Sequence, residues 1–278
     1  MRVILSRKGF DSTYGGFPSP IIEKRTLLSL PIPGDEPSDE CGCSITYDEL
    51  KYNGVCYAEM IESLSGGTFR KEGRYCHLDP DIRKDIRKVP ENWQAAFGQV
   101  NSAQGHLEKQ NVGIDDLFLF FGLYKNAKWS RNKLVYDSQA SRKHIIFGYL
   151  QIGKIVKGEE IKSYYWHPHS KGYTEENNTI YVASDKLVID GEDTGLNGYG
   201  TFNYSEDLVL TKENYSCTKW MIPDFFREVT MTYHSSKSFK DGYFQSASRG
   251  QEFVISENGK VTDWAKKLIL ENIDTENH

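Results

Sequence analysis

The chain has 278 residues, enough to bury a substantial core, and 38% of them are hydrophobic. Its 17 Tyr, 14 Phe, 5 Trp and 24 Gly favour strands and turns over helices. The net charge of -5 excludes a global positive field for a long polyanion, and no apolar run is long enough to span a membrane. Five cysteines in a chain of this length do not resemble a disulfide-rich secreted scaffold, so the expected setting is the cytoplasm.

In chain order, the pattern begins with predicted strands at 2–6 and 26–32, which a loop rich in Gly and Pro separates. Residues 35–44 are acidic, small and turn-rich, and are predicted to form a loop or an insertion. A short helix is expected at 57–64. Residues 93–107 have apolar side chains at helical spacing, but two internal glycines weaken the helical signal.

Two strands at 117–124 and 144–156 are predicted to be central in the sheet. Both are apolar at nearly every position, as expected of strands that are covered on both faces. Gly148 and Gly153 lie inside the second strand, where glycine indicates a bulge or a close backbone approach. A curved strand of this sort belongs in a small barrel.

The rest of the chain is predicted to be rich in short strands, at 179–183, 186–190, 207–211 and 252–255. Thr262 is expected to open a C-terminal helix that ends at Ile273. No internal repeat or obvious linker divides the chain. The sequence therefore predicts one α+β domain over residues 1–278, built on a curved, mostly antiparallel sheet or barrel with peripheral helices.

The first candidate site is the loop after the first strand. Gly15 and Gly16 allow its backbone to adopt positive φ angles and to approach a ligand closely. The polar side chains that would project from this turn are those of Arg7, Lys8, Asp11 and Tyr14. The alternative is an ordinary connection between strands in which the aspartate caps a turn.

Two histidines are candidates for acid–base chemistry. His77 lies two residues before Asp79, and a carboxylate at that spacing can orient an imidazole that titrates near neutral pH. Alternatively, the Asp-Pro step starts a turn and the imidazole is only packed. His106 follows Gln99 and Gln104, whose amides can read the edge of a base or satisfy buried backbone groups.

His167 and His169 form a His-x-His pair, which is a weak candidate for metal binding because no carboxylate or cysteine follows at a recognisable spacing. We therefore predict no metal site. The cysteines lack paired C-x-x-C motifs and are expected to be scattered reduced thiols; those considered are Cys41, Cys43, Cys56 and Cys76. No Walker lysine loop, H-E-x-x-H, G-x-S-x-G or G-x-G-x-x-G occurs, so no motif identifies a cofactor.

We predict that these polar motifs converge on one cleft that binds a nucleotide or a base within DNA. The catalytic candidates are His77, Asp79, His106 and Asp11. The nucleotide-binding candidates are Arg7, Lys8, Tyr14, Gly15, Gly16, Gln99, Gln104, Arg249 and Glu252. The last two could alternatively form a surface salt bridge. Tyr14, Trp93 and Phe97 are available to stack on the base, and the basic segment 125–143 around Trp129 to hold phosphates.

A string of motifs runs along almost the whole chain. It reads ILSRKGFDS at 4–12, YGG at 14–16, SP at 19–20, SLPIP at 29–33 and HLDPD at 77–81. It continues with AFGQ at 96–99, AQGHL at 103–107, DLFLFFG at 116–122, IFGYLQIG at 146–153, HPH at 167–169 and RGQEF at 249–253. This string resembles the third class of nucleotide modification associated domain. Residues 115–121 and 148–155 are also similar to the core hairpin of PUA-like barrels, some of which bind modified bases.

The resemblance implies a role in bacterial or phage systems that modify or handle unusual DNA bases. One hypothesis is an enzyme in which His77 or His106 is a general acid or base held by Asp79 or Asp11. A second is a reader that only binds a modified base in an aromatic pocket. A third is a metal-dependent nuclease or hydrolase that uses His167 and His169. We favour the enzyme, because a reader needs fewer titratable groups than this chain supplies.

Overall fold

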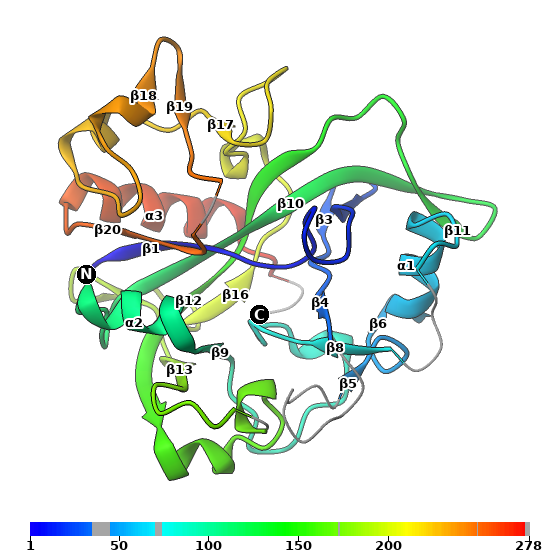
Figure 1. Ribbon diagram of the computed structural model, residues 1–278, viewed down its shortest axis with the longest axis horizontal. Coiled ribbons are helices and arrows are strands. Elements are labelled where there is room, and N and C mark those ends of the chain that lie inside the picture. Colours follow the sequence, from blue (N-terminus) through cyan, green and yellow to red (C-terminus); the bar gives the residue numbers. More distant parts are fainter. Residues whose placement is uncertain (35–44, 70–73, 172, 249, 276–278) are drawn as a thin grey trace.

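The computed structural model has mixed sheets and a few helices, so the α+β class is confirmed (Figure 1). It describes residues 1–34, 45–69, 74–171, 173–248 and 250–275. The insertion predicted at 35–44, with Cys41 and Cys43, lies outside these ranges, as does Arg249. No helix in the described ranges has the length and hydropathy needed to cross a membrane.

The predicted central strands are central. The main sheet is ten-stranded, and its principal path runs β20 (Glu252–Ile255), β1 (Val3–Arg7), β10 (Leu117–Ser130), β12 (Lys143–Lys157), β13 (Thr179–Ala183) and β9 (Ala96–Gln99). Along this path β1 pairs with β10 in parallel and every other pair is antiparallel. The two long strands are buried on both faces over most of their length, which explains their continuous apolar pattern.

The long strands change partners along their length. The first half of β10 pairs with β1 and its second half with β2 (Ser19–Ile22), while β12 pairs with β16 (Tyr199–Thr201) and then with β13. The register shifts next to Gly148 and again at Gly153, so both glycines mark irregularities, as predicted. The predicted PUA-like barrel is wrong, because within the described ranges the main path ends at two unjoined strands, β20 and β9.

The remaining strands form short additions and small sheets. β3 (Thr26–Leu27) pairs with β2, and β11 (Lys133–Tyr136) with β10. The small sheets comprise β4 (Ile32–Pro33), β8 (Tyr75–His77) and β5 (Ile45–Thr46); β6 (Lys51–Tyr52) and β7 (Val55–Cys56); β14 (Val188–Ile189) and β15 (Glu192–Asp193); and β17 (Lys219–Trp220), β19 (Tyr243–Gln245) and β18 (Phe239–Lys240).

Three α-helices are described, α1 (Tyr57–Leu64), α2 (Asn101–Lys109) and α3 (Gly259–Asn272). The 3-10 turns are η1 (Lys84–Ile86), η2 (Gly158–Ser163), η3 (Pro168–Ser170), η4 (Glu206–Leu208), η5 (Asp224–Glu228) and η6 (Ser236–Ser238). In Figure 1, α3 lies on one side of β1 and β20, and α2 lies on the other. α3 contacts β1 and α2 contacts β20, so both helices pack at this end of the sheet.

Several predicted elements differ from those observed. Residues 26–32 split into β3 and β4, because Pro31 cannot donate to a ladder. Residues 93–107 divide into β9 and α2, and 207–211 contains the end of η4, which the Ser205 hydroxyl caps. The C-terminal helix starts three residues earlier than predicted, at Gly259, because the Asn258 side chain accepts a hydrogen bond from the Lys260 N–H.

Candidate active site

β8 and the segment after it present His77 and Asp79. Successive side chains of an extended segment point to opposite faces, and Cys76 and Leu78 are buried in an apolar cluster with Leu30. The alternate residues, His77 and Asp79, therefore face away from this cluster. The backbone N–H of Asp79 donates to the His77 carbonyl, which fixes the turn between them.

A second segment brings His167 and His169 to the same carboxylate. Trp166 belongs to another apolar cluster, and Pro168 is buried at the start of η3. β13 follows η3 and pairs with β9, so that η3 lies against β9. The ring of His169 packs on Gly98, where an added Cβ would lie 2.2 Å from His169 Cδ2. Glycine at this position therefore makes room for the imidazole.

The Asp79 carboxylate lies among three imidazoles in the described part of the chain. Asp79 Oδ2 is 3.8 Å from both His77 Nε2 and His169 Nε2, and Asp79 Oδ1 is 3.3 Å from His167 Nε2. The Gly98 N–H also donates to Asp79 Oδ1, at 2.9 Å. The side chain of His77 is the most exposed of the four, at 13%. We call His77, Asp79, His167 and His169 the histidine cluster.

The electrostatics of the histidine cluster keep Asp79 ionised. Burial alone would raise the pKa of Asp79, but contacts with His167 and His77 hold it well below its usual range. Burial lowers the pKa of His169 to about 3, against the opposing charge of Asp79. At neutral pH the cluster thus contains an anionic carboxylate beside a neutral His169, and this combination can accept a proton or a cation.

Tyr173 and a small cavity complete the surroundings of the cluster. The ring of Tyr173 stacks on His169, with centroids 4.4 Å apart and an angle of 9° between the planes. A cavity of about 30 Å³, enough for one or two water molecules, lies at Asp79 and is also lined by Gly9, Ser29 and Arg83. It places Gly9, which belongs to the motif at 4–12, close to Asp79.

Lys8, Gln99 and Glu252 form a second group. Glu252 Oε1 accepts from both Lys8 Nζ and Gln99 Nε2, each at 2.8 Å, and its side chain is fully buried. Lys8 Nζ also lies 4.4 Å from the centroid of the Phe97 ring. Three segments that are distant in sequence therefore meet in one buried ion-pair network.

Helix α2 adds His106 and Gln104 to this side of the molecule. His106 Nε2 is 3.1 Å from Thr232 Oγ1, and burial lowers the pKa of His106 against the charge of Glu252. Gln104 is buried and accepts a hydrogen bond from the Tyr181 hydroxyl. The partner of this amide is therefore a buried side chain, whereas the alternative that we considered was a buried backbone group.

The opening turn forms a third group. Asp11 Oδ1 accepts from the N–H groups of Thr13 and Tyr14, as in an Asx turn. Tyr14 is 45% exposed. A Cβ at Gly15 would lie 2.2 Å from the Phe10 ring, so this glycine is required by packing. The predicted cleft lined by all these residues stays a prediction, since the contacts assemble them in three groups.

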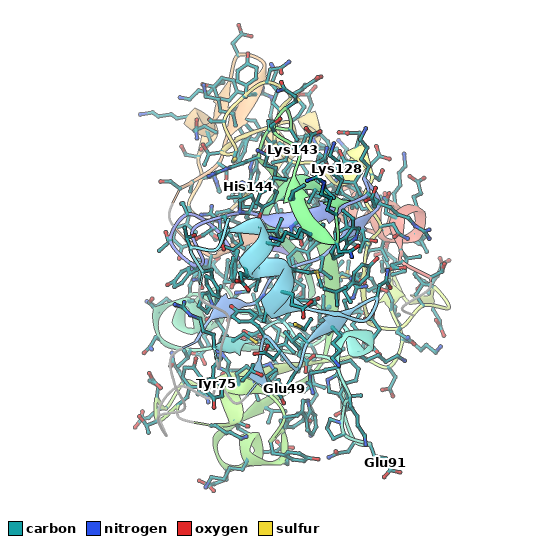
Figure 2. The ribbon with its side chains drawn as sticks, turned by 90° about the vertical axis from the view of Figure 1, so that its right-hand side faces the viewer. Glu49, Tyr75, Glu91, Lys128, Lys143 and His144 are labelled. Carbon is teal, nitrogen blue, oxygen red and sulfur yellow. The ribbon has the colours of Figure 1, made fainter. Side chains whose placement is uncertain are left out.

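Arg7 and the basic segment 125–143 were also predicted to contribute to the site, and their contacts are with other parts of the molecule. Arg7 donates to the carbonyls of Ala247 and Ser248. Figure 2 shows Lys128 and Lys143 in the upper half of the molecule, on β10 and β12, whereas Glu49 and Tyr75 lie in the lower half near β5 and β8. The basic segment is therefore at the end of the long strands remote from β8.

The sequence reasoning missed the convergence of the two His-containing motifs. It paired His77 with Asp79 and treated His167 and His169 as separate, for lack of a nearby carboxylate. It also missed Asn178, whose side chain contacts His169 Nδ1 at 2.8 Å. The available signal was Gly98 in a buried strand, which indicates the close approach of another group.

A family model, nucleotide modification associated domain 3, matches residues 2–256. The match includes every residue of the histidine cluster and ends before α3. The comparisons with curated proteins and with solved structures found no match.

Proposed function

The chain belongs to the nucleotide modification associated domain 3 family, and we propose that it is an enzyme acting on a nucleotide or on a base exposed from DNA. Membership implies a role in nucleotide modification systems. The proposal places the reaction centre at the histidine cluster. It rests on one observation, that a buried, ionised Asp79 lies between His77 and His169 at 3.8 Å from each.

Neither a reader nor a structural core requires this arrangement. A buried carboxylate is costly unless it is paired, and an apolar residue would fill the same space at lower cost. Perturbed carboxylates and imidazoles that face one another gather at sites of proton transfer or metal binding. His77 is the partly exposed member, so it is the residue closest to an incoming nucleotide.

The test is a search for turnover. The purified protein is incubated with nucleotides and with DNA oligonucleotides that carry plain or modified bases, with and without divalent ions, and products are followed by mass spectrometry. We expect turnover that His77→Gln and His169→Gln each reduce by about 100-fold or more. The control is Lys154→Gln, an exposed residue paired with Glu160, and it should retain activity.

The outcomes separate the proposal from its alternative. Binding of modified bases without any turnover would overturn the enzyme and support the reader. Turnover that survives both histidine substitutions would place the reaction centre elsewhere, with the group around Lys8 and Glu252 as the next candidate.

A further inference from the structure

We propose that His77, Asp79 and His169 bind a divalent transition-metal ion. The inference rests on the geometry of the histidine cluster and would deepen the proposed function by supplying its cofactor. The nearest ligand atoms of the three residues all lie within 4.8 Å of one another. Two ligands of a tetrahedral zinc ion are separated by about 3.4 Å, so a small inward movement closes the site.

The hydrogen bonds of Asn178 fix the proton on His169. Asn178 Nδ2 donates to the backbone carbonyl of His169, at 2.9 Å, and this carbonyl can only accept. Asn178 therefore presents its Oδ1 to His169 Nδ1, at 2.8 Å, and Nδ1 must carry a proton. The neutral ring then has a bare lone pair on Nε2, the atom that faces Asp79 Oδ2.

A lone pair beside a carboxylate oxygen is repulsive unless a cation lies between them. In His167 the ring proton is on the opposite nitrogen. His167 Nδ1 accepts the N–H of His169, at 3.2 Å, so Nδ1 carries no proton and the ring proton of His167 is on Nε2, which faces Asp79 Oδ1. His167 is thus a positioning residue for the carboxylate, and His169 offers an electron pair.

The two oxygens of Asp79 have separate surroundings. Asp79 Oδ1 faces donors, the Gly98 N–H and His167 Nε2. Asp79 Oδ2 faces His77 and His169. The Gly98 N–H and His167 therefore hold Asp79, and Asn178 holds His169. Groups that orient metal ligands in this way are typical of the outer shell of a metal site.

The donor set indicates the class of ion. Two imidazoles and one carboxylate suit zinc or iron(II), whereas magnesium and calcium prefer oxygen ligands alone. Three protein ligands leave a coordination position for water or substrate. His77 would then be a ligand, and a metal-bound water would take the place of its imidazole as the proton-carrying group.

The test measures metal binding directly. The full chain is treated with a chelator, dialysed and titrated with Zn²⁺ by calorimetry, and Co²⁺ binding is followed by its visible absorption. We expect one ion per chain, and a loss of affinity of about 100-fold in His169→Ala and in His77→Gln. His167→Ala should lose about tenfold, as a positioning residue. The control is His106→Gln, whose imidazole contacts Thr232 and should leave affinity unchanged.

Folding of each variant is checked by circular dichroism. If His169→Ala does not fold, His77→Gln still tests the site, because His77 is partly exposed and its replacement disturbs the core less. A folded wild type that binds neither ion would overturn the inference, as would equal affinity in wild type and both ligand variants. Metal binding without turnover would leave the inference standing and remove the proposed enzyme. Turnover that persists in metal-free protein would support the enzyme and overturn the role of the ion as its cofactor.

Discussion

The imidazole of His169 packs on Gly98, and a side chain at position 98 would occupy its space, with a Cβ 2.2 Å from His169 Cδ2. This contact joins the two halves of the histidine cluster, because the N–H of the same glycine donates to Asp79. The absence of a side chain at Gly98 therefore allows the Asp79 carboxylate and the His169 imidazole, which come from distant segments, to face each other.

We predict that Gly98→Ala destabilises the protein and separates His169 from Asp79. Overpacking of a buried site costs about 1–3 kcal/mol. The matched control is Gly105→Ala in α2, where the nearest atom to an added Cβ is 4.0 Å away and alanine should stabilise the helix by about 0.5–1 kcal/mol. Denaturant unfolding of both variants measures the two effects. Equal stabilities for the two variants would contradict the contact.

The sequence predicted the centre of the fold well, because strands covered on both faces are apolar at nearly every position, as β10 and β12 are. Gly148 and Gly153 likewise indicated irregularities from a local signal. Which strands pair with each other was harder to predict from the sequence. β10 exchanges β1 for β2 midway, and no local pattern encodes this exchange, so the sequence left a curved sheet and a barrel as alternatives.

The candidate site was predictable only in part. The spacing of His77 and Asp79 is local, so their pairing could be predicted. His169 reaches the same carboxylate through the pairing of β13 with β9, a contact that depends on the whole fold. The same dependence explains why Glu252 could not be assigned its partners Lys8 and Gln99 in advance.

We next predict that Glu252→Gln lowers the free energy of unfolding by about 3 kcal/mol, since it leaves the ammonium of Lys8 buried without a counter-charge. The double variant Lys8→Met with Glu252→Gln should be more stable than the sum of the single changes, because both charges are then removed. Chemical denaturation of the four proteins in the cycle provides the measurement. Strict additivity would show that the pair makes no coupled contribution to stability.

Stability should also fall in mild acid, in part because of His144. Burial, with the nearby charge of Arg7, lowers the pKa of His144 to about 3, and its Nδ1 accepts from Trp220 Nε1. Since the folded pKa is depressed, the unfolded chain takes up a proton first, and stability is lost as pH falls below about 6.5 towards 3. From pH 7 to pH 5 this one group costs about 2 kcal/mol.

The comparison with His144→Asn isolates this group. The amide oxygen of asparagine can accept from Trp220 but does not titrate, so the variant should lose about 2 kcal/mol less than wild type between pH 7 and pH 5. The other histidines are the same in both proteins and cancel. Parallel stability curves for the two proteins over this range would mean that His144 is protonated equally in the folded and unfolded states.

The last prediction concerns the basic segment, whose expected role is to hold phosphates. Lys128 is exposed on β10, and Lys143 lines a groove of about 820 Å³ with Asn126 and Lys212. If these side chains contact a DNA backbone, Lys128→Gln with Lys143→Gln should weaken binding of a duplex at every sequence. It should also reduce the slope of log K against log salt by about 1.8.

The control for this pair changes charge equally at the other end of β12. Lys154 and Lys157 carry the same charge but lie outside the basic segment 125–143, so replacing both with glutamine should change the salt slope little if that segment holds the phosphates. Fluorescence anisotropy at several salt concentrations compares the two double variants. An equal loss of affinity in both would attribute binding to overall charge and remove the basic segment as a phosphate contact, whereas a loss confined to the first would place the DNA backbone along β10 and β12.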